Sequence, residues 1–359
     1  MESTVNLPVV GMDIAKNVFQ LHWVDAPTGQ IKRRTLKRDR VLTFFANREV
    51  SLIAMEACGG AHHWARTLQE QGHQVKLLPA GQVRPFVPRD KTDATDAQGI
   101  WVAAQQRHIH AVAVKSVSQQ AALSLHRLRH QLMKVRTMQT NLLRSQLLEF
   151  GLTLPVGYRP LLAQIDQALV HAQAQLPDYY IVTLQEQVRR ILDLQADMDA
   201  IEQRIIQQAK DNAATQAIMA IPGVGPLSAT AVVASMAQPE SFSSARQFAA
   251  WLGLTPRQTG TGGKVRQLGI SKRGDRYLRT LLMHGARAVI ARSTPTSWIA
   301  RLLARRPYCV VVAALANKLA RTIWAVLVKG KPFDPAKWNP ETAALCLERG
   351  GVVCATDPS

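Results

Sequence analysis

The sequence has few cysteines, few acids and no evident targeting segment. Its cysteines show no paired spacing of the kind that indicates a zinc site or a disulfide framework; they are Cys58, Cys309, Cys346 and Cys354. Asp13 and Lys16 interrupt the N-terminal apolar stretch, which argues against a secretory signal. The best apolar run, 310–316, ends at Asn317 and is too short to span a bilayer. These absences predict a reduced, cytoplasmic protein with no membrane partner.

Acidic side chains are scarce compared with basic ones. The chain of 359 residues has 25 Asp and Glu against 44 Lys and Arg, which gives a net charge of +19 and a pI of about 10.4. So much like charge destabilises a compact fold unless a polyanion offsets it, and nucleic acid is therefore the leading partner. An apolar share of 47% excludes a disordered chain, and the length suffices for two or three domains.

Strands and helices alternate in the N-terminal third. Apolar or alternating runs predict five strands, at 8–15, 18–24, 31–36, 51–56 and 74–78. Helices are expected at 40–47 and 61–71, before and after the fourth strand. This order predicts an α/β domain whose first three strands form a meander.

Two of these strands end on an acid, and two further acids begin a later helix. Asp13 closes the first apolar run and Glu56 the fourth, and sites in open α/β sheets form at the carboxyl ends of strands. Asp93 and Asp96 precede the apolar-periodic run 97–104, so they share one face of a helical turn. Taken alone, this pair is better explained by structure, with Asp93 as a helix cap and Asp96 as a favourable first-turn charge. Together the four carboxylates suit two magnesium ions about 4 Å apart, an arrangement used in phosphodiester chemistry.

Two long helical patterns occupy the middle of the chain. Apolar residues recur at three and four residues over 118–150 and over 184–209, and a loop containing Gly151, Pro155, Gly157 and Pro160 is expected after the first pattern. The spacing predicts an antiparallel coiled-coil-like hairpin or helices that pair between protomers, and a plain helical bundle also fits. The first helix carries basic residues and the second carries acids, so the first is the better nucleic-acid face.

Glycines and basic residues dominate the C-terminal third. Gly223 and Gly225 separate helical runs 213–220 and 227–236, and such a turn either cradles a backbone phosphate or simply connects two helices. A Gly-rich loop around Thr261 follows, among cations that are expected to bind nucleic acid: Arg257, Lys264, Arg266, Lys272, Arg273, Arg276 and Arg279. A hydroxyl in this setting suits attack on a phosphodiester, and a loop that only grips phosphate is the alternative.

Three short motifs, in this order and at these spacings, resemble those of one transposase family. They are Gly11-Met12-Asp13-Ile14-Ala15-Lys16, Met55-Glu56-Ala57-Cys58-Gly59 and Lys91-Thr92-Asp93-Ala94-Thr95-Asp96-Ala97. They look like the DEDD motifs of the insertion sequence one-ten family (one-triple-one-like subgroup), whose members act as bridge-RNA-guided DNA recombinases. The resemblance implies an α/β ribonuclease-H-like, RuvC-type catalytic domain over 1–116 and a helical coiled-coil connector over 117–211. It also implies a mainly α transposase domain with a helix-hairpin-helix-like element over 212–330, and 331–359 is expected to be a peripheral tail.

The same resemblance assigns a nucleophile. In the family a serine of the Gly-rich loop becomes attached to a DNA 5′ phosphate, and counting from Leu254-Thr255-Pro256-Arg257 places that position at Thr261, with Thr259 as the fallback. Threonine keeps the hydroxyl but adds a methyl group that stiffens the side chain. Ser271 is the remaining candidate, and it lies beside a basic helix expected over 272–279.

The resemblance further implies a cofactor and partners. Mg²⁺, with Mn²⁺ as an alternative, is expected at Asp13, Glu56, Asp93 and Asp96 as two ions. The expected partners are donor and target DNA, a noncoding bridge RNA and further copies of the chain, in a dimer or a tetramer in the bacterial cytoplasm and nucleoid. Two other functions fit the residues alone: a metal-dependent RuvC-like junction resolvase or nuclease that uses water, and a non-enzymatic basic nucleic-acid-binding protein.

Overall fold

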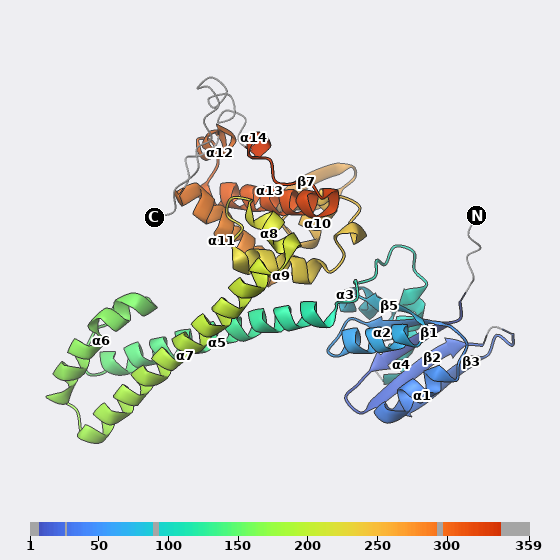
Figure 1. Cartoon of the computed structure of the whole chain (residues 1–359), viewed down its shortest axis with the longest axis horizontal. Helices are drawn as coiled ribbons and strands as arrows, with labels where there is room; N and C mark the ends of the chain where they lie inside the picture. The colour runs from blue at the N-terminus through green and yellow to red at the C-terminus, as the bar shows by residue number, and fades with distance from the viewer. Residues whose placement is uncertain (1–6, 26, 89–92, 293–296, 339–359) are drawn as a thin grey trace. The chain divides into compact units, whose positions relative to one another are not determined.

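The structure is a computed structural model, and it describes residues 7–25, 27–88, 93–292 and 297–338 (Figure 1). The chain divides into two compact units, Met1–Ser118 and Gln119–Ser359. Lys91 and Thr92 of the third motif and residues 339–359 of the predicted tail lie outside the described residues. The four-part division expected from the sequence stays a prediction.

A five-stranded mixed sheet lies at the centre of the first unit. Its strands are β1 (Val9–Ile14), β2 (Val18–Val24), β3 (Ile31–Lys37), β4 (Leu52–Glu56) and β5 (Gln74–Leu78). They lie in the order β3-β2-β1-β4-β5. β2 is antiparallel to both β1 and β3, whereas β1, β4 and β5 run parallel. The predicted strands and the three-strand meander are confirmed to within about a residue at each end.

Helices cover both faces of this sheet (Figure 1). The helices of the unit are α1 (Val41–Ala46), α2 (Ala61–Glu70), α3 (Ala80–Val83) and α4 (Asp93–Ala104), with 3-10 turns η1 (Arg38–Arg40) and η2 (Arg84–Phe86). Phe45 of α1 and Trp64 of α2 are buried in the core beneath one face, and Ile100 of α4 is buried in the core of the other. Because side chains alternate along a strand, Met12 faces the α1 and α2 side, and the next residue, Asp13, faces α4.

Gly11 allows α4 to lie directly on β1. A Cβ atom at this position would come within 2.3 Å of the Ala97 carbonyl oxygen and 2.7 Å of the Trp101 backbone nitrogen. The Trp101 indole also donates to the Val9 carbonyl oxygen at 3.1 Å. A glycine two residues before Asp13, on the same face of the strand, therefore sets the close approach of the helix that begins with two acids.

The described residues of the second unit are mainly helical, with one β-hairpin. Its longer helices are α5 (Val117–Leu148, which begins at the junction), α6 (Tyr158–Gln173), α7 (Asp178–Lys210), α9 (Pro226–Met236), α11 (Arg276–Arg292) and α13 (Tyr308–Lys329). The shorter elements are α8 (Ala213–Met219), η3 (Pro239–Ser241), α10 (Ala245–Trp251), α12 (Ser297–Leu303) and α14 (Pro335–Trp338), and the hairpin is β6 (Pro256–Thr261) with β7 (Lys264–Ile270).

The long helices α5 and α7 run antiparallel, as the ribbon shows (Figure 1). Helix α6 was not predicted, since its stretch was interpreted as a loop on the strength of Gly157 and Pro160. Pro160 lies in the first turn of α6, where a missing N–H costs nothing. Leu161 and Ile165 of α6 join a core cluster that contains residues from α5 and α7. At this end the connector is therefore a three-helix bundle.

Helix α13 corrects the expectation that no segment is long and apolar enough to span a bilayer. It has 22 residues and an 18-residue window of mean hydropathy 1.6. Leu315, Leu319 and Ile323 on it are fully buried in the core of the second unit. Its apolar composition is that of a central core helix, which packs against α10 and α11.

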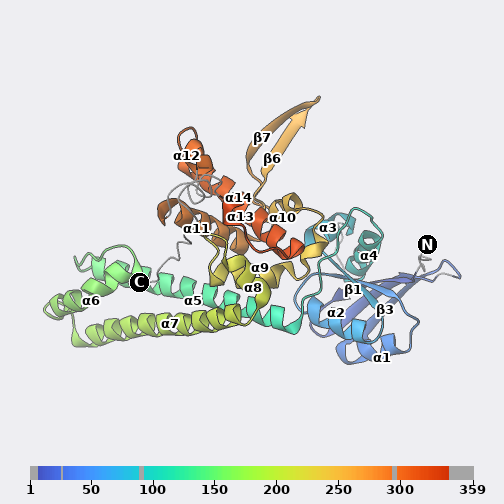
Figure 2. The same ribbon diagram turned by 45° about the horizontal axis from the view of Figure 1, so that its top comes forward.

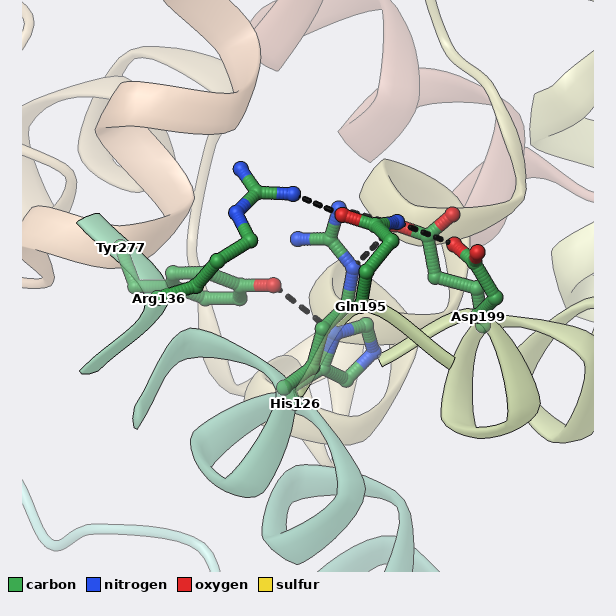
Figure 3. Close-up of polar contacts among 7 residues, drawn as sticks. His126, Arg136, Gln195, Asp199 and Tyr277 are labelled. Carbon is green, nitrogen blue, oxygen red and sulfur yellow. Dashed lines mark hydrogen bonds and ion pairs between the residues drawn. The ribbon is translucent and has the colours of Figure 1, made fainter. Parts of the chain in front are cut away.

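A buried histidine of α5 contacts side chains of α9 and α11 in the second unit, and Figure 3 draws its contact with Tyr277. His126 of α5 is 1% exposed, and its ring contacts the Tyr277 hydroxyl of α11 at 3.0 Å and the Thr230 hydroxyl of α9 at 2.9 Å. Thr230 donates to the Pro226 carbonyl oxygen, so it accepts from Nε2–H, and Nδ1 accepts from Tyr277.

Two further pairs tie α5 to α7. Arg129, which lies one turn after His126, pairs with Glu202 of α7. Arg136 donates to Gln195, whose amide donates to Asp199 at 2.7 Å (Figure 3). Basic side chains of α5 are therefore partly occupied by α7, which reduces the cationic face that the sequence offered to nucleic acid.

His126 makes the second unit sensitive to acid. Burial, and then the nearby Arg129, lower its pKa from 6.5 to about 4, so the folded state holds it neutral. The contribution of neutral His126 to the free energy of unfolding is complete above pH 6.5. It is lost as the pH falls from 6.5 through 4, and the total loss is on the order of 3 kcal/mol. We expect His126→Gln to be less stable than the parent at pH 7.5, and the gap in unfolding free energy to narrow by this amount at pH 4. Urea unfolding of both chains at the two pH values measures it, and an unchanged gap would contradict the prediction.

Candidate metal centre and nucleophile hairpin

Three of the four predicted metal ligands lie together in the first unit. Asp13 is at the carboxyl end of β1, and Asp93 and Asp96 are in the first turn of α4. One carboxylate oxygen from each lies within 4.8 Å of the others. Asp93 is exposed, whereas Asp13 and Asp96 are half-buried. Asp93 is the first residue of the helix, so both acids belong to its first turn.

Burial and the neighbouring acids both work against the ionisation of Asp13. Burial raises the pKa of Asp13 from 3.8 to about 6, and the charges of Asp96, Asp93 and Glu56 add to this in that order. A hydrogen bond from the Ile14 backbone lowers the pKa only in part. Ionisation of Asp13 is therefore disfavoured, and a divalent cation among the three acids would favour its charged form.

Glu56 lies beside the group and not within it. It ends β4, the parallel neighbour of β1, and its charge acts on Asp13, but its oxygens are outside the 4.8 Å set. The thiol of Cys58 is a poor ligand, because burial and the charges of Glu56 and Asp13 raise its pKa. A donor set made of carboxylates alone fits a hard cation such as Mg²⁺ or Mn²⁺ better than zinc.

The predicted Gly-rich loop is a β-hairpin, and this corrects the sequence interpretation. β6 and β7 pair antiparallel, and Thr261 lies opposite Lys264 across a two-residue turn. Gly262 and Gly263 form that turn with φ values of 56° and 78°, which glycine adopts readily and which two-residue hairpins require. The hairpin projects from the helices of its unit (Figure 2), and all of β6 is exposed. Thr261 is thus at the tip of a ribbon, with Thr259 two residues before it on the same face.

Most of the predicted nucleic-acid-binding cations are exposed on or beside this hairpin. Six of the seven are exposed, and they are Arg257, Lys264, Arg266, Lys272, Arg273 and Arg276. Arg279 is half-buried, and its guanidinium donates to the Leu252 carbonyl oxygen at 2.9 Å. Arg279 therefore holds the base of the hairpin in place, which is a structural role that the sequence did not reveal.

The basic helix begins later than expected. Helix α11 starts at Arg276, and Asp275 caps it by accepting from the Leu278 backbone N–H at 2.9 Å. Residues 272–275 form a turn in which Lys272 has a φ of 54°. Ser271 precedes this turn and donates its backbone N–H to Thr255, so it belongs to the base of the hairpin and not to the helix.

The two glycines predicted to bind phosphate, Gly223 and Gly225, have different structural surroundings. Gly223 has a φ of 82°, and a Cβ atom there would come within 2.7 Å of the Gly285 carbonyl oxygen of α11. Close helix packing alone explains this residue. Gly225 is the N-cap of α9, ahead of Pro226, and a Cβ atom at this position would have no atom within 4 Å. A phosphate at the start of α9 stays a prediction.

The sequence interpretation missed a set of cations in the first unit. They occupy the edge strand β3 and the turn that follows: Lys32, Arg33, Arg34, Lys37, Arg38 and Arg40. The signal was present as a run of bases between 32 and 40 with Asp39 as its single acid. Its relation to the metal centre depends on strand register, which the run itself does not give.

Comparisons with known proteins agree with this arrangement. Residues 10–151 match the family model of the IS110-type DEDD transposases, and residues 215–301 match the model described as "Transposase IS116/IS110/IS902 family". A "Probable family 20 transposase" of Pseudomonas aeruginosa is 44% identical over 92% of this chain and 100% of its own length. The "Transposase for insertion sequence element IS1328" of Yersinia enterocolitica is 36% identical over 92% of this chain and 99% of its own length.

A third relative extends the comparison. The "Transposase for insertion sequence element IS1111A" of Coxiella burnetii is 36% identical over 92% of both chains. The mixed sheet and the mainly helical second unit fit the ribonuclease-H-like architecture of DEDD transposases. This chain belongs to the IS110 family of DEDD transposases.

Proposed function

We propose that this transposase cuts and rejoins DNA at a magnesium site formed by Asp13, Glu56, Asp93 and Asp96, with Thr261 as the nucleophile. The observation that carries the proposal is the meeting of the Asp13, Asp93 and Asp96 carboxylates from β1 and α4. Family membership makes the chain a DNA transposase that depends on a divalent metal, and it excludes the non-enzymatic alternative.

Each carboxylate has a part in holding the metal. Asp13, Asp93 and Asp96 present converging oxygens, and Glu56 lies one strand further along the sheet. Bound Mg²⁺ would stabilise the charge that develops on the attacking and leaving oxygens of a phosphodiester. The raised pKa of Asp13 shows that burial and the neighbouring charges work against its ionised form, which a bound cation would favour.

Strand cleavage would pass through a phosphothreonine link. The Thr261 hydroxyl oxygen forms a bond to the scissile phosphorus and loses its proton, while the bond from phosphorus to the 3′ oxygen breaks and that oxygen gains one. The DNA 5′ phosphate stays attached to Thr261 until a second 3′ hydroxyl displaces it. Lys264, directly opposite across the turn, and Arg266 supply positive charge beside the reacting phosphate.

The carboxylates and Thr261 belong to different compact units, and we propose that a homo-oligomer, a dimer or a tetramer, completes the site. We further propose that a noncoding bridge RNA selects the donor and target DNA by base pairing, and the net charge of +19 and the family membership of the chain support this proposal.

The guide is tested by the RNA that accompanies the protein. We expect chain purified from cells that carry its flanking noncoding DNA to bring down one RNA from that flank, enriched at least about tenfold over bulk RNA. RNA sequencing measures it, with the Asp13→Asn chain as a control that retains binding. Recovery of ribosomal and transfer RNA alone would contradict the guided reaction.

A further inference from the structure

A row of polar side chains connects the metal centre with the edge of the sheet. Strand register pairs Asp13 of β1 with Gln20 of β2, and Gln20 with Thr35 of β3. Residues directly opposite on neighbouring strands point to the same face, so all three lie on the α4 side. The Thr35 hydroxyl donates to the Gln20 side-chain oxygen at 2.8 Å. Two strand spacings of about 4.8 Å therefore separate the acids from the sheet edge.

Arg33 stands at that edge on the same face. It lies two residues before Thr35, and its guanidinium donates to Gln98 Oε1 of α4 at 3.2 Å. Gln98 follows Asp96 by two residues, so Arg33 is tied to the helix that carries the acids. The Arg33 side chain is exposed, and a guanidinium has five N–H donors, most of which remain for a phosphate.

Other cations of this edge are engaged elsewhere. The Arg34 guanidinium lies 5.3 Å from the centre of the Phe44 ring, and the Arg38 guanidinium 5.0 Å from that of Trp64. Both rings belong to the α1 and α2 side of the sheet. Charges on an edge strand also serve to prevent aggregation, and Arg34 and Arg38 fit that role. Arg33 differs because it faces the metal centre.

We propose that Gln20 and Arg33 bind the phosphate backbone of the DNA strand that enters the metal centre across β3. Arg33 neutralises one phosphate at the edge, and the Gln20 amide, whose oxygen Thr35 holds, donates to the backbone nearer Asp13. Gln20, Arg33 and Thr35 together position the scissile phosphate. DNA is the partner because the row leads into the carboxylates at which DNA is cut, so the inference rests on the proposed function.

The strand offers a matched control for this role. Lys32 precedes Arg33, is also exposed and donates to Gln30 at 3.0 Å, but it faces the opposite side of the sheet. Full-length chain with its accompanying RNA would be titrated, without metal, against a labelled duplex from the element's end over a series of KCl concentrations. We expect Arg33→Gln to weaken binding about tenfold and to lower the log–log salt slope by about 1, and Lys32→Gln to leave the slope unchanged.

Replacing single phosphates of the DNA by uncharged methylphosphonates locates the phosphate that Arg33 contacts. A methylphosphonate placed at successive positions around the cut should weaken binding by the parent at one position, and Arg33→Gln should be indifferent to that same substitution. Arg33→Lys should restore the salt slope, and melting curves of all variants should coincide with that of the parent. Equal behaviour of Arg33→Gln and Lys32→Gln, or a larger loss for an RNA oligonucleotide than for DNA, would overturn the inference.

The cutting assay separates this inference from the proposed function. If the parent chain cuts DNA in Mg²⁺, and Arg33→Gln and Lys32→Gln bind DNA with the same affinity and salt slope, the edge contact alone is refuted. Parent chain that never cuts would refute the proposed function, and the slope and methylphosphonate results would still decide whether Arg33 touches the backbone.

Discussion

Asp13→Asn and Asp93→Asn should each lower magnesium-dependent DNA strand cutting at least about a thousandfold, while DNA binding remains. Each substitution removes one negative oxygen from the group of three that lies within 4.8 Å. Because Glu56 lies outside that group, Glu56→Gln should cost less than either aspartate change. Gel assays of cut DNA at saturating protein measure the loss. Asp39→Asn is the matched control, since Asp39 is exposed in the same unit and contacts Arg40 only at 3.9 Å.

A thermal measurement separates metal binding from damage to the fold. Burial and repulsion disfavour the ionised form of Asp13, so Asp13→Asn should melt above the parent without metal. Mg²⁺ should raise the melting temperature of the parent and leave that of the variant unchanged. The metal must also displace a proton from Asp13 below about pH 6, so its effect on the parent should weaken there. Recombination that survives both substitutions would refute the whole site.

Much of the first unit was predictable because its signals are local. The strands that end at Asp13 and Glu56 are short apolar runs, and the spacing of Asp93 and Asp96 places both in the first turn of a helix. Gly11 carried a further signal, since a glycine two residues before an acid in a buried strand permits another element to lie on it.

Some features were not predicted because two local sequence signals conflicted, and others because they depend on how the strands pair. Leu161 and Ile165 have the spacing of an amphipathic helix, and they are buried in α6. The nearby Gly157 and Pro160 favoured a loop in the sequence interpretation and hid this helix. Gly262-Gly263 is a hairpin signal that was interpreted as a ligand loop. The alignment of Gln20 with Asp13 arises from cross-strand pairing, and no local pattern specifies that.

The hairpin makes the nucleophile testable with few confounding effects on the fold. Thr261 is exposed at the end of β6, beside a turn of two glycines, so substitutions there should not disturb the core. Thr261→Ala should lower cutting at least about a thousandfold and abolish any covalent protein–DNA adduct. Thr261→Ser should retain both, because it keeps the hydroxyl and removes only the methyl group that crowds the β-carbon. Labelled DNA on denaturing gels, with mass spectrometry of the linked peptide, measures the adduct.

The neighbouring hydroxyls decide between the remaining mechanisms. Thr259 lies two residues before Thr261 on the same exposed face, and Ser271 is in the base of the hairpin, so Thr259→Ala and Ser271→Ala are matched controls that should keep the adduct. Loss of the adduct in either control, with retention in Thr261→Ala, would move the nucleophile to that residue. Cutting by Thr261→Ala at the parent's rate, without any adduct in the parent, would mean that water attacks the phosphate. The carboxylate site would then act as a nuclease on its own, and the hairpin would only grip DNA through Lys264 and Arg266.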